Sequence, residues 1–104
     1  MQNSLGIPGA KIHKIDYSDL LYIEGLREYV TFHTTQKKIT ALYVMKTLED
    51  ILPKDRFMRV HKSYIVAVKS IEMIEGNMPK IKQETIPIGG SYKNELLVRL
   101  SKKR

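Results

Sequence analysis

The chain alternates hydrophobic and polar residues in short runs that are separated by turn-forming segments. Residues 11–15 (KIHKI) and 20–24 (LLYIE) each predict a short strand, with a turn at residues 16–19 between them. The first ten residues contain two Gly and one Pro and show no regular period. They predict a flexible lead-in, or the edge of an expressed fragment, ahead of one domain at residues 11–104.

A stronger alternation follows in the sequence EYVTFHT, residues 28–34, which places Val30 and Phe32 on one face and His33 on the other. A polar reversal then returns the chain through a second alternating run. Residues 29–41 are therefore predicted to form a hairpin with one buried face.

One segment changes to a helical period. In residues 41–52 (ALYVMKTLEDIL) the apolar positions fall at helical spacing, which predicts a helix of about three turns. Thr40 can cap the start of this helix, and Pro53 stops it.

Beyond Pro53 the chain is strand-like again, and Gly76-Asn77 predicts a hairpin turn between two further strands. Gly89-Gly90 breaks the last strand. Residues 91–100 then predict a short terminal helix with Ser91 as its N-cap. The predicted fold class is mainly β, with short antiparallel strands in small sheets and one or two short helices.

The net charge adds a functional indication to this pattern. The chain has 18 Lys plus Arg against 11 Asp plus Glu, a formal charge of +7, and a pI near 9.7. An excess of this size favours a polyanionic partner, first nucleic acid and second an acidic membrane surface.

Other features of the composition narrow the classes of protein. There is no cysteine, which fits a reducing cytoplasm, and no apolar run approaches the roughly 20 residues that a membrane span needs. We therefore expect a soluble, cytoplasmic domain without membrane contact. A length of 104 residues is enough for a hydrophobic core without disulfides.

The residue patterns typical of catalysis are missing. The sequence has no GxGxxG, no phosphate-binding loop ending in Lys-Ser/Thr and no GxSxG. His13, His33 and His61 lie on different predicted strands without metal-ligand spacing. We therefore expect no enzymatic activity, no cofactor and no metal site.

Three polar segments interrupt otherwise strand-like sequence: GLREY (25–29), RVHKS (59–63) and GGSYKN (89–94). Each offers donors suited to phosphates or base edges. The candidate residues are Arg27, Arg59, His61, Lys62, Ser63, Ser91, Tyr92, Lys93 and Asn94.

The order of LYIEGLREYVTFHT, a helix ending in LP, RFMRVHKSYIV and IPIGGSYKNEL closely resembles the LytTR family of bacterial DNA-binding domains. Members of this family are output modules of many response regulators. The resemblance runs from about Lys14 to Leu100, and the F-x-R-x-H-[K/R]-S-Y signature at residues 57–64 is specific.

This resemblance implies a fold that sends loops, rather than a recognition helix, into the DNA grooves. The family pattern puts Arg27, Glu28 and Tyr29 in one major groove, and the loop at residues 90–93 in the next. It lays the turn of His61, Lys62 and Ser63 over the backbone between them. A receiver or sensor domain upstream, and a dimer on paired half-sites, are also implied.

Two positions depart from the family pattern. Gly90 stands where many relatives have Arg or Lys, so Ser91, Tyr92 or Lys93 would supply base readout there. Ala67 stands where the family usually has Asn, whose loss would loosen the local loop.

Several candidate residues also have a purely structural interpretation. Arg59 could pair with a carboxylate, and His61 could hold the turn through a backbone hydrogen bond. Lys62 could be an idle surface lysine, Tyr92 could anchor the terminal helix, and Ser91 could be only an N-cap.

The sequence thus predicts a sequence-specific double-stranded DNA-binding output domain of a bacterial transcriptional regulator that belongs to a two-component system. The alternative is a small basic β domain that binds RNA or single strands, or a protein-interaction module. A single-strand reader should display aromatic side chains on an exposed platform. This chain has two Phe and no Trp, and its tyrosines are scattered through apolar strands.

Overall fold

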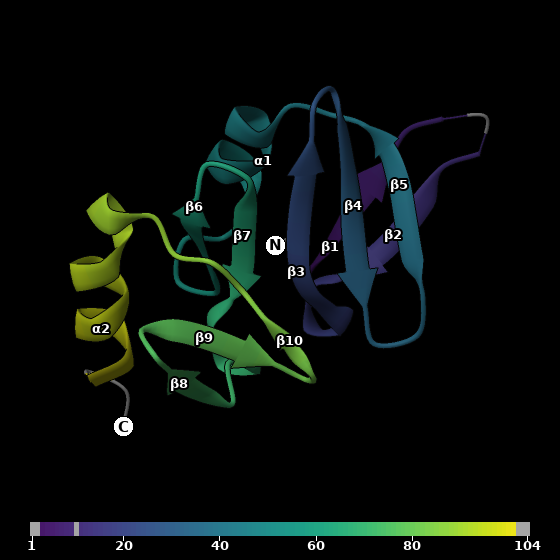
Figure 1. Cartoon of the computed structure of the whole chain (residues 1–104). Coiled ribbons are helices and arrows are strands. Elements are labelled where there is room, and N and C mark those ends of the chain that lie inside the picture. Colours follow the sequence, from purple (N-terminus) through teal and green to yellow (C-terminus); the bar gives the residue numbers. More distant parts are fainter. Residues whose placement is uncertain (1–2, 10, 102–104) are drawn as a thin grey trace.

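The computed structural model describes residues 3–9 and 11–101, and its centre is a five-stranded antiparallel sheet (Figure 1). In spatial order the strands are β5 (Lys38–Leu42), β4 (Tyr29–Thr34), β3 (Leu20–Leu26), β7 (Tyr64–Ala67) and β6 (Phe57–His61). The pairing of β4 with β5 confirms the hairpin predicted at residues 29–41.

Smaller elements surround this sheet. One two-stranded sheet contains β1 (Ser4–Ile7) and β2 (His13–Asp16), and a three-stranded sheet contains β8 (Met73–Glu75), β9 (Met78–Ile81) and β10 (Glu84–Thr85). The helices are α1 (Met45–Ile51) and α2 (Lys93–Ser101). Short 3₁₀ helices occur at Tyr17–Asp19, Val68–Ser70 and Gly90–Tyr92. The predicted mainly-β class is confirmed.

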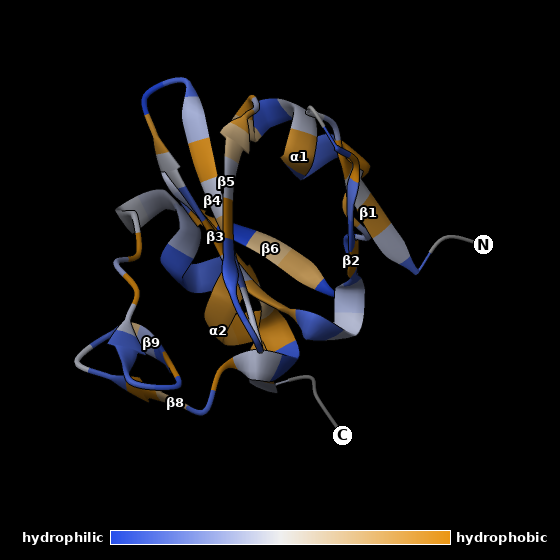
Figure 2. Cartoon of the chain, turned by 90° about the vertical axis from the view of Figure 1, so that its right-hand side faces the viewer, coloured by the Kyte–Doolittle hydropathy of each residue, from blue (hydrophilic) through white to orange (hydrophobic). Residues whose placement is uncertain are grey.

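Alternate residues along a strand point to opposite faces of the sheet. In the central sheet, part of each face is buried in a hydrophobic core. Ile23 and Phe32 face a core that β1, β2 and α1 complete, whereas Tyr22 and Val66 face a core that β9 and α2 complete. Figure 2 shows hydrophobic residues in orange on β6 and on α2. The central sheet is therefore held from both sides.

The flexible lead-in predicted for the first ten residues is wrong over Ser4–Ile7, which forms β1. This strand pairs antiparallel with β2 from Ser4 opposite Asp16 to Ile7 opposite His13. Leu5 and Ile7 alternate with polar or small neighbours and are buried in the core. The strand period was hidden by the adjacent Gly and Pro. Met1, Gln2 and Ala10 lie outside the described residues.

The helix predicted at residues 41–52 is shorter than expected. Ala41 and Leu42 continue β5, where Leu42 lies opposite Tyr29, and α1 begins only at Met45. Thr40 is also in β5 and does not cap the helix. Strand pairing with β4 overrides the local helical pattern at these positions, while Leu48 is buried as its spacing predicts.

The terminal helix also begins later than predicted. A 3₁₀ turn at Gly90–Tyr92 precedes α2, so Ser91 lies inside that turn and is not the N-cap. Leu96 is buried as predicted, whereas Leu97 is exposed. The hairpin turn at Gly76 and Asn77 is confirmed, and both residues have the positive φ angles, 58° and 67°, that a type I′ turn requires.

Candidate nucleic-acid interface

The three polar segments singled out in the sequence lie at the same end of the domain (Figure 1). They become the β3–β4 turn at Arg27 and Glu28, the β6–β7 turn at Lys62 and Ser63, and the 3₁₀ turn before α2. Backbone hydrogen bonds tie them together. Gly25 N donates to Ser63 O at 2.8 Å, and Gly89 N donates to Val60 O at 2.7 Å.

The first turn is tight and exposes its two central side chains. Arg27 has a φ of 62°, in the left-handed region that a two-residue hairpin turn requires at its first position. Backbone strain of roughly 1 kcal/mol or more is expected for a side chain other than glycine there. Tyr43 N donates to Glu28 O at 3.2 Å, which braces the turn. Arg27 therefore projects from a fixed backbone.

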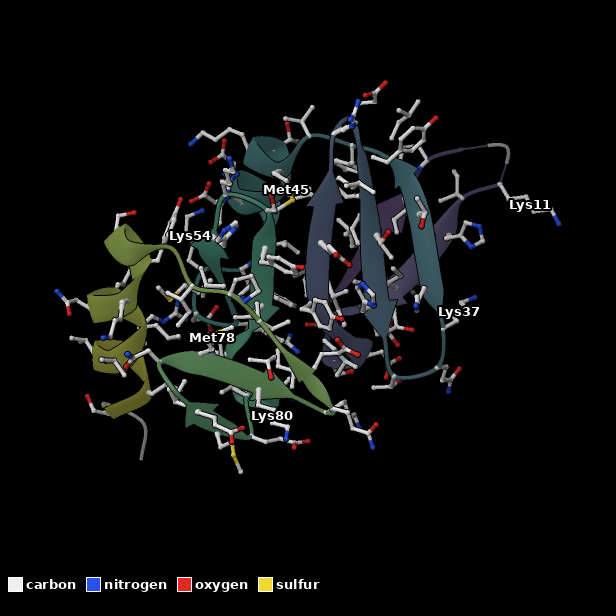
Figure 3. All side chains as sticks on the ribbon, viewed as in Figure 1. Lys11, Lys37, Met45, Lys54, Met78 and Lys80 are labelled. Atoms are coloured by element: carbon white, nitrogen blue, oxygen red, sulfur yellow. The ribbon has the colours of Figure 1, made fainter. Side chains whose placement is uncertain are left out.

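Gly25 allows the strand to approach α1 closely. A Cβ atom on this residue would lie 3.0 Å from Met45 Cγ. Met45 stands at the start of α1, beside the upper end of β3 in Figure 3. β3 continues through Gly25 to Leu26, beyond the strand predicted at residues 20–24.

The second turn is built by Arg59 and His61. The Arg59 guanidinium donates to Lys62 O at 2.6 Å and His61 O at 3.3 Å, and it pairs with Glu49 Oε1 at 2.9 Å. Ser63 N donates to His61 Nδ1 at 3.1 Å. Because Nδ1 accepts this bond, the neutral imidazole carries its proton on Nε2. Both side chains thus hold the turn, as their structural interpretation predicted.

Lys62 differs from these two residues because its side chain is exposed at the tip of the turn. The ion pairs of the described residues do not involve it. The segment RFMRVHKSYIVAV contains two antiparallel strands, β6 and β7, and the turn between them lies at the polar interruption that the sequence predicted. Arg59 and His61 form the support that presents Lys62.

In the third turn the two glycines have different roles. A Cβ on Gly89 would lie 3.0 Å from Tyr92 Cδ2, so this position must stay small. A Cβ on Gly90 would meet no atom within 4 Å, and the φ angle of Gly90 is not in the left-handed region. Ser91 is exposed, whereas Tyr92 and Lys93 are half-buried.

A polar network that sequence reasoning missed lies below these turns, on the face of the sheet that also carries Tyr22 and Val66. His33 Nε2 lies 3.1 Å from Glu24 Oε1, and Tyr64 donates its hydroxyl proton to Glu24 Oε2 at 3.0 Å. The ring of Tyr22 stacks on His33 with centroids 4.1 Å apart. Burial, followed by nearby carboxylates, raises the pKa of Tyr22 to about 12.

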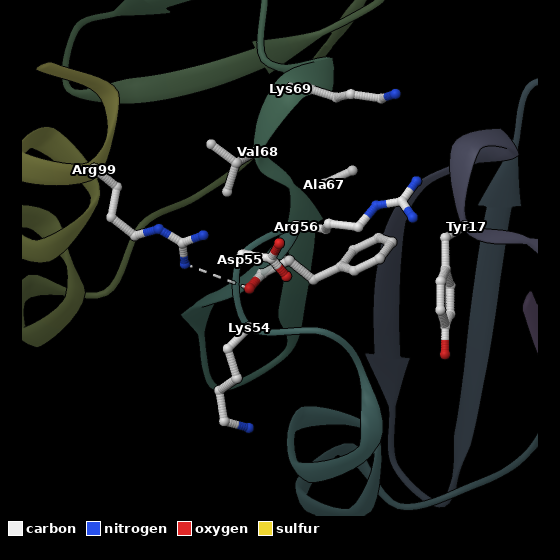
Figure 4. A pocket seen from close by; sticks show the side chains of 9 residues that line it. Tyr17, Lys54, Asp55, Arg56, Ala67, Val68, Lys69 and Arg99 are labelled. Atoms are coloured by element: carbon white, nitrogen blue, oxygen red, sulfur yellow. Dashed lines mark hydrogen bonds between the residues drawn. The ribbon is translucent and has the colours of Figure 1, made fainter. Parts of the chain in front are cut away.

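A basic pocket lies at the opposite end of the β6–β7 hairpin from the Lys62 turn (Figure 4). Its volume is about 570 Å³, and Phe57, Ala67 and Val68 contribute its apolar lining. The cations Lys54, Arg56, Lys69 and Arg99 surround it together with Asp55. Arg56 lies 5.5 Å from the ring centroid of Tyr17, and Arg99 donates to Phe57 O at 3.4 Å.

Within residues 3–9 and 11–101 no group of three His, Asp or Glu side chains gathers to hold a metal ion. His13, His33 and His61 lie on β2, β4 and β6. Among the same residues, neither helix is long and apolar enough to cross a membrane.

Comparisons with known proteins show the family and the fold of the chain. Residues 10–101 match the model of the LytTr DNA-binding domain, so the chain belongs to the LytTR family. This is a family of DNA-binding domains and not a family of enzymes.

One similar solved structure is the LytTr DNA-binding domain of a Bacillus cereus protein that is assigned as a methyl-accepting/DNA response regulator. The TM-score is 0.83 at 22% sequence identity, and the alignment covers 96% of this chain and 98% of that chain. The likeness confirms the fold. No curated protein matches this chain significantly.

Proposed function

We propose that this domain binds double-stranded DNA in a sequence-specific manner and is the output domain of a bacterial transcriptional regulator. The observation that carries this proposal is the joining of three exposed turns at one end by backbone hydrogen bonds. These turns present Arg27, Lys62 and Ser91 in a chain of net charge +7. Such a surface suits a partner with regularly spaced phosphates and grooves.

Each turn has a distinct part in this proposal. Arg27, with Glu28 and Tyr29, enters one major groove, and Ser91, Tyr92 and Lys93 enter the next. Lys62 and Ser63 contact the phosphates between them. Arg59 and His61 act through the backbone of the Lys62 turn, because Arg59 Nε and Nη2 and His61 Nδ1 are engaged with that turn.

The exposure of the aromatic residues argues against a single-strand reader. Of the two Phe and six Tyr, only Tyr29 is exposed, and the others are half-buried or buried. Proteins that bind single strands stack bases on exposed aromatic side chains. The domain offers no such platform.

Membership of the family supports a proposal for the regulatory setting. We propose that a receiver or sensor domain precedes this domain in the full-length regulator and that the system is a two-component one. Binding as a dimer on paired half-sites would then place two copies of the three turns along one face of the duplex.

Salt dependence tests the proposal directly. If Arg27, Lys62, Lys93 and their neighbours neutralise about four to six phosphates, log K should fall with log salt at a slope of about −4 to −5. Titration of a duplex pool selected from random sequences, at several salt concentrations, measures this slope. Equal affinity for single strands, or a shallow slope, would contradict duplex reading.

Gly90 offers a second test, since the site tolerates a side chain. Gly90→Arg is expected to fold normally and to gain about tenfold preference for sites with guanine at one position, because Arg can donate to both O6 and N7. Gly89→Ala is the contrasting variant, since its Cβ would crowd Tyr92, and it should lower the melting temperature. A folded Gly90→Arg protein with unchanged preference at every base pair would show that this turn does not face a major groove.

A further inference from the structure

Exposed apolar side chains gather beside the β3–β4 turn. Among the described residues nine large hydrophobic side chains are exposed, and four of them lie at this end of the sheet. They are Leu26 at 72%, Tyr29 at 49%, Leu42 at 63% and Val44 at 61%. Neither hydrophobic core includes these side chains, so the fold does not account for them.

Strand register places three of these residues side by side. Leu26 lies opposite Tyr29 across β3 and β4, and Tyr29 lies opposite Leu42 across β4 and β5. Directly opposed residues of antiparallel strands share a face, and their Cβ atoms are about 4.5–5.5 Å apart. Leu26, Tyr29 and Leu42 thus form a continuous apolar row across three strands.

The apolar row adjoins Arg27, which lies between Leu26 and Tyr29 in the sequence and at the tip of the same hairpin. A major groove of B-DNA admits a two-stranded ribbon, and thymine is the base that presents a methyl group there. A hairpin that brings Arg27 to a base edge would therefore bring the apolar row to the same groove.

We propose that the apolar row contacts thymine C5-methyl groups and makes the domain selective for thymine beside the base that Arg27 contacts. This inference rests on the proposed function and assigns a specificity role to Leu26, Tyr29 and Leu42.

Charge favours DNA over a second copy of this chain as the occupant of the row. Two copies that met through it would bring their exposed Arg27 side chains together, in a chain that already carries a net charge of +7. A duplex supplies phosphates that neutralise Arg27 while its methyl groups cover the apolar row.

Uracil substitution tests the inference, because deoxyuridine keeps every hydrogen-bonding group of thymidine and lacks only the methyl group. Each thymine of a selected duplex is replaced in turn, and affinity is measured for the wild-type domain. At the contacted thymines we expect a loss of roughly fourfold per methyl group, the effect of exposing one methyl-sized apolar group. Thymines elsewhere in the duplex should tolerate the replacement.

The variants Leu26→Gln and Leu42→Gln identify the protein partner of each methyl group. Each variant should bind the thymine duplex more weakly than the wild type does. Its affinity should also change little when uracil replaces thymine at one position, because the effects of removing two groups in contact are not additive. Met73→Gln is the matched control, because Met73 is similarly exposed, at 53%, on β8. Both Figure 1 and Figure 2 place β8 at the far end of the domain from the β3–β4 turn. This control should retain full uracil sensitivity.

The outcomes separate this inference from the proposed function. If duplex binding is specific but no uracil substitution weakens it, the apolar row does not read thymine and the inference fails alone. Sedimentation that shows a dimer in the wild type and a monomer in Leu42→Gln, again without uracil sensitivity, would assign the row to a second copy. If no duplex is preferred over single strands, the proposed function itself is wrong.

Discussion

Replacing both Leu5 and Ile7 by alanine is expected to leave most of the domain unfolded at room temperature. Both side chains are buried in the core formed by β1, β2, α1 and the central sheet. A single Leu→Ala or Ile→Ala change in a core costs about 2–5 kcal/mol, against a total stability of about 5–15 kcal/mol. Urea denaturation followed by circular dichroism measures the loss.

The control for this experiment is Ile12→Ala. Ile12 lies just before β2 and is 78% exposed, so its replacement should change stability by no more than about 0.5 kcal/mol. If the Leu5→Ala/Ile7→Ala double variant unfolded at the wild-type urea concentration, β1 would not be part of the cooperative fold.

Replacing Arg59 by either alanine or lysine is expected to weaken DNA binding by about 30- to 100-fold without changing the salt slope. The guanidinium contacts Glu49, His61 O and Lys62 O together, and the single ammonium of lysine cannot reproduce that geometry. Loss of these bonds would release the turn that presents Lys62. Lys62→Ala should instead weaken all duplexes alike and reduce the slope by about one.

Glu49→Gln separates the positioning role of Arg59 from direct phosphate contact. Removing a negative charge would strengthen binding to DNA if only the overall field mattered. The variant should instead bind more weakly, because Glu49 Oε1 holds the Arg59 guanidinium at 2.9 Å. Wild-type affinity in Arg59→Lys, with a slope reduced by about one in Arg59→Ala, would mean that Arg59 contacts phosphate directly.

Local patterns predicted the parts of this fold that depend on neighbouring residues. The alternation of Val30 and Phe32 gave the buried face of β4, and Gly76-Asn77 gave the turn between β8 and β9. The polar interruption at His61, Lys62 and Ser63 correctly marked a turn. In each case the signal lies within a few residues of the feature.

Features that depend on distant partners could not be predicted in this way. β1 is stable because it pairs with β2, and it precedes all of the residues that match the family. The contact of Arg59 with Glu49 joins β6 to α1, and that of Glu24 with Tyr64 joins residues 40 positions apart. Neither spacing carries a periodic signal, so only the folded arrangement shows which polar side chains are already engaged.

The bonds that join the turns involve backbone atoms at Gly25, Ser63, Val60 and Gly89, and not the exposed side chains at the tips. A change of residue type at Arg27, Lys62 or Ser91 therefore leaves the connecting bonds in place. In the proposed mode of binding, recognition and folding are carried by different atoms of the same turns, so the two can diverge independently during evolution. New operator preferences could arise by exchange of tip residues alone, and the same separation makes this domain a suitable scaffold for retargeting to other DNA sequences.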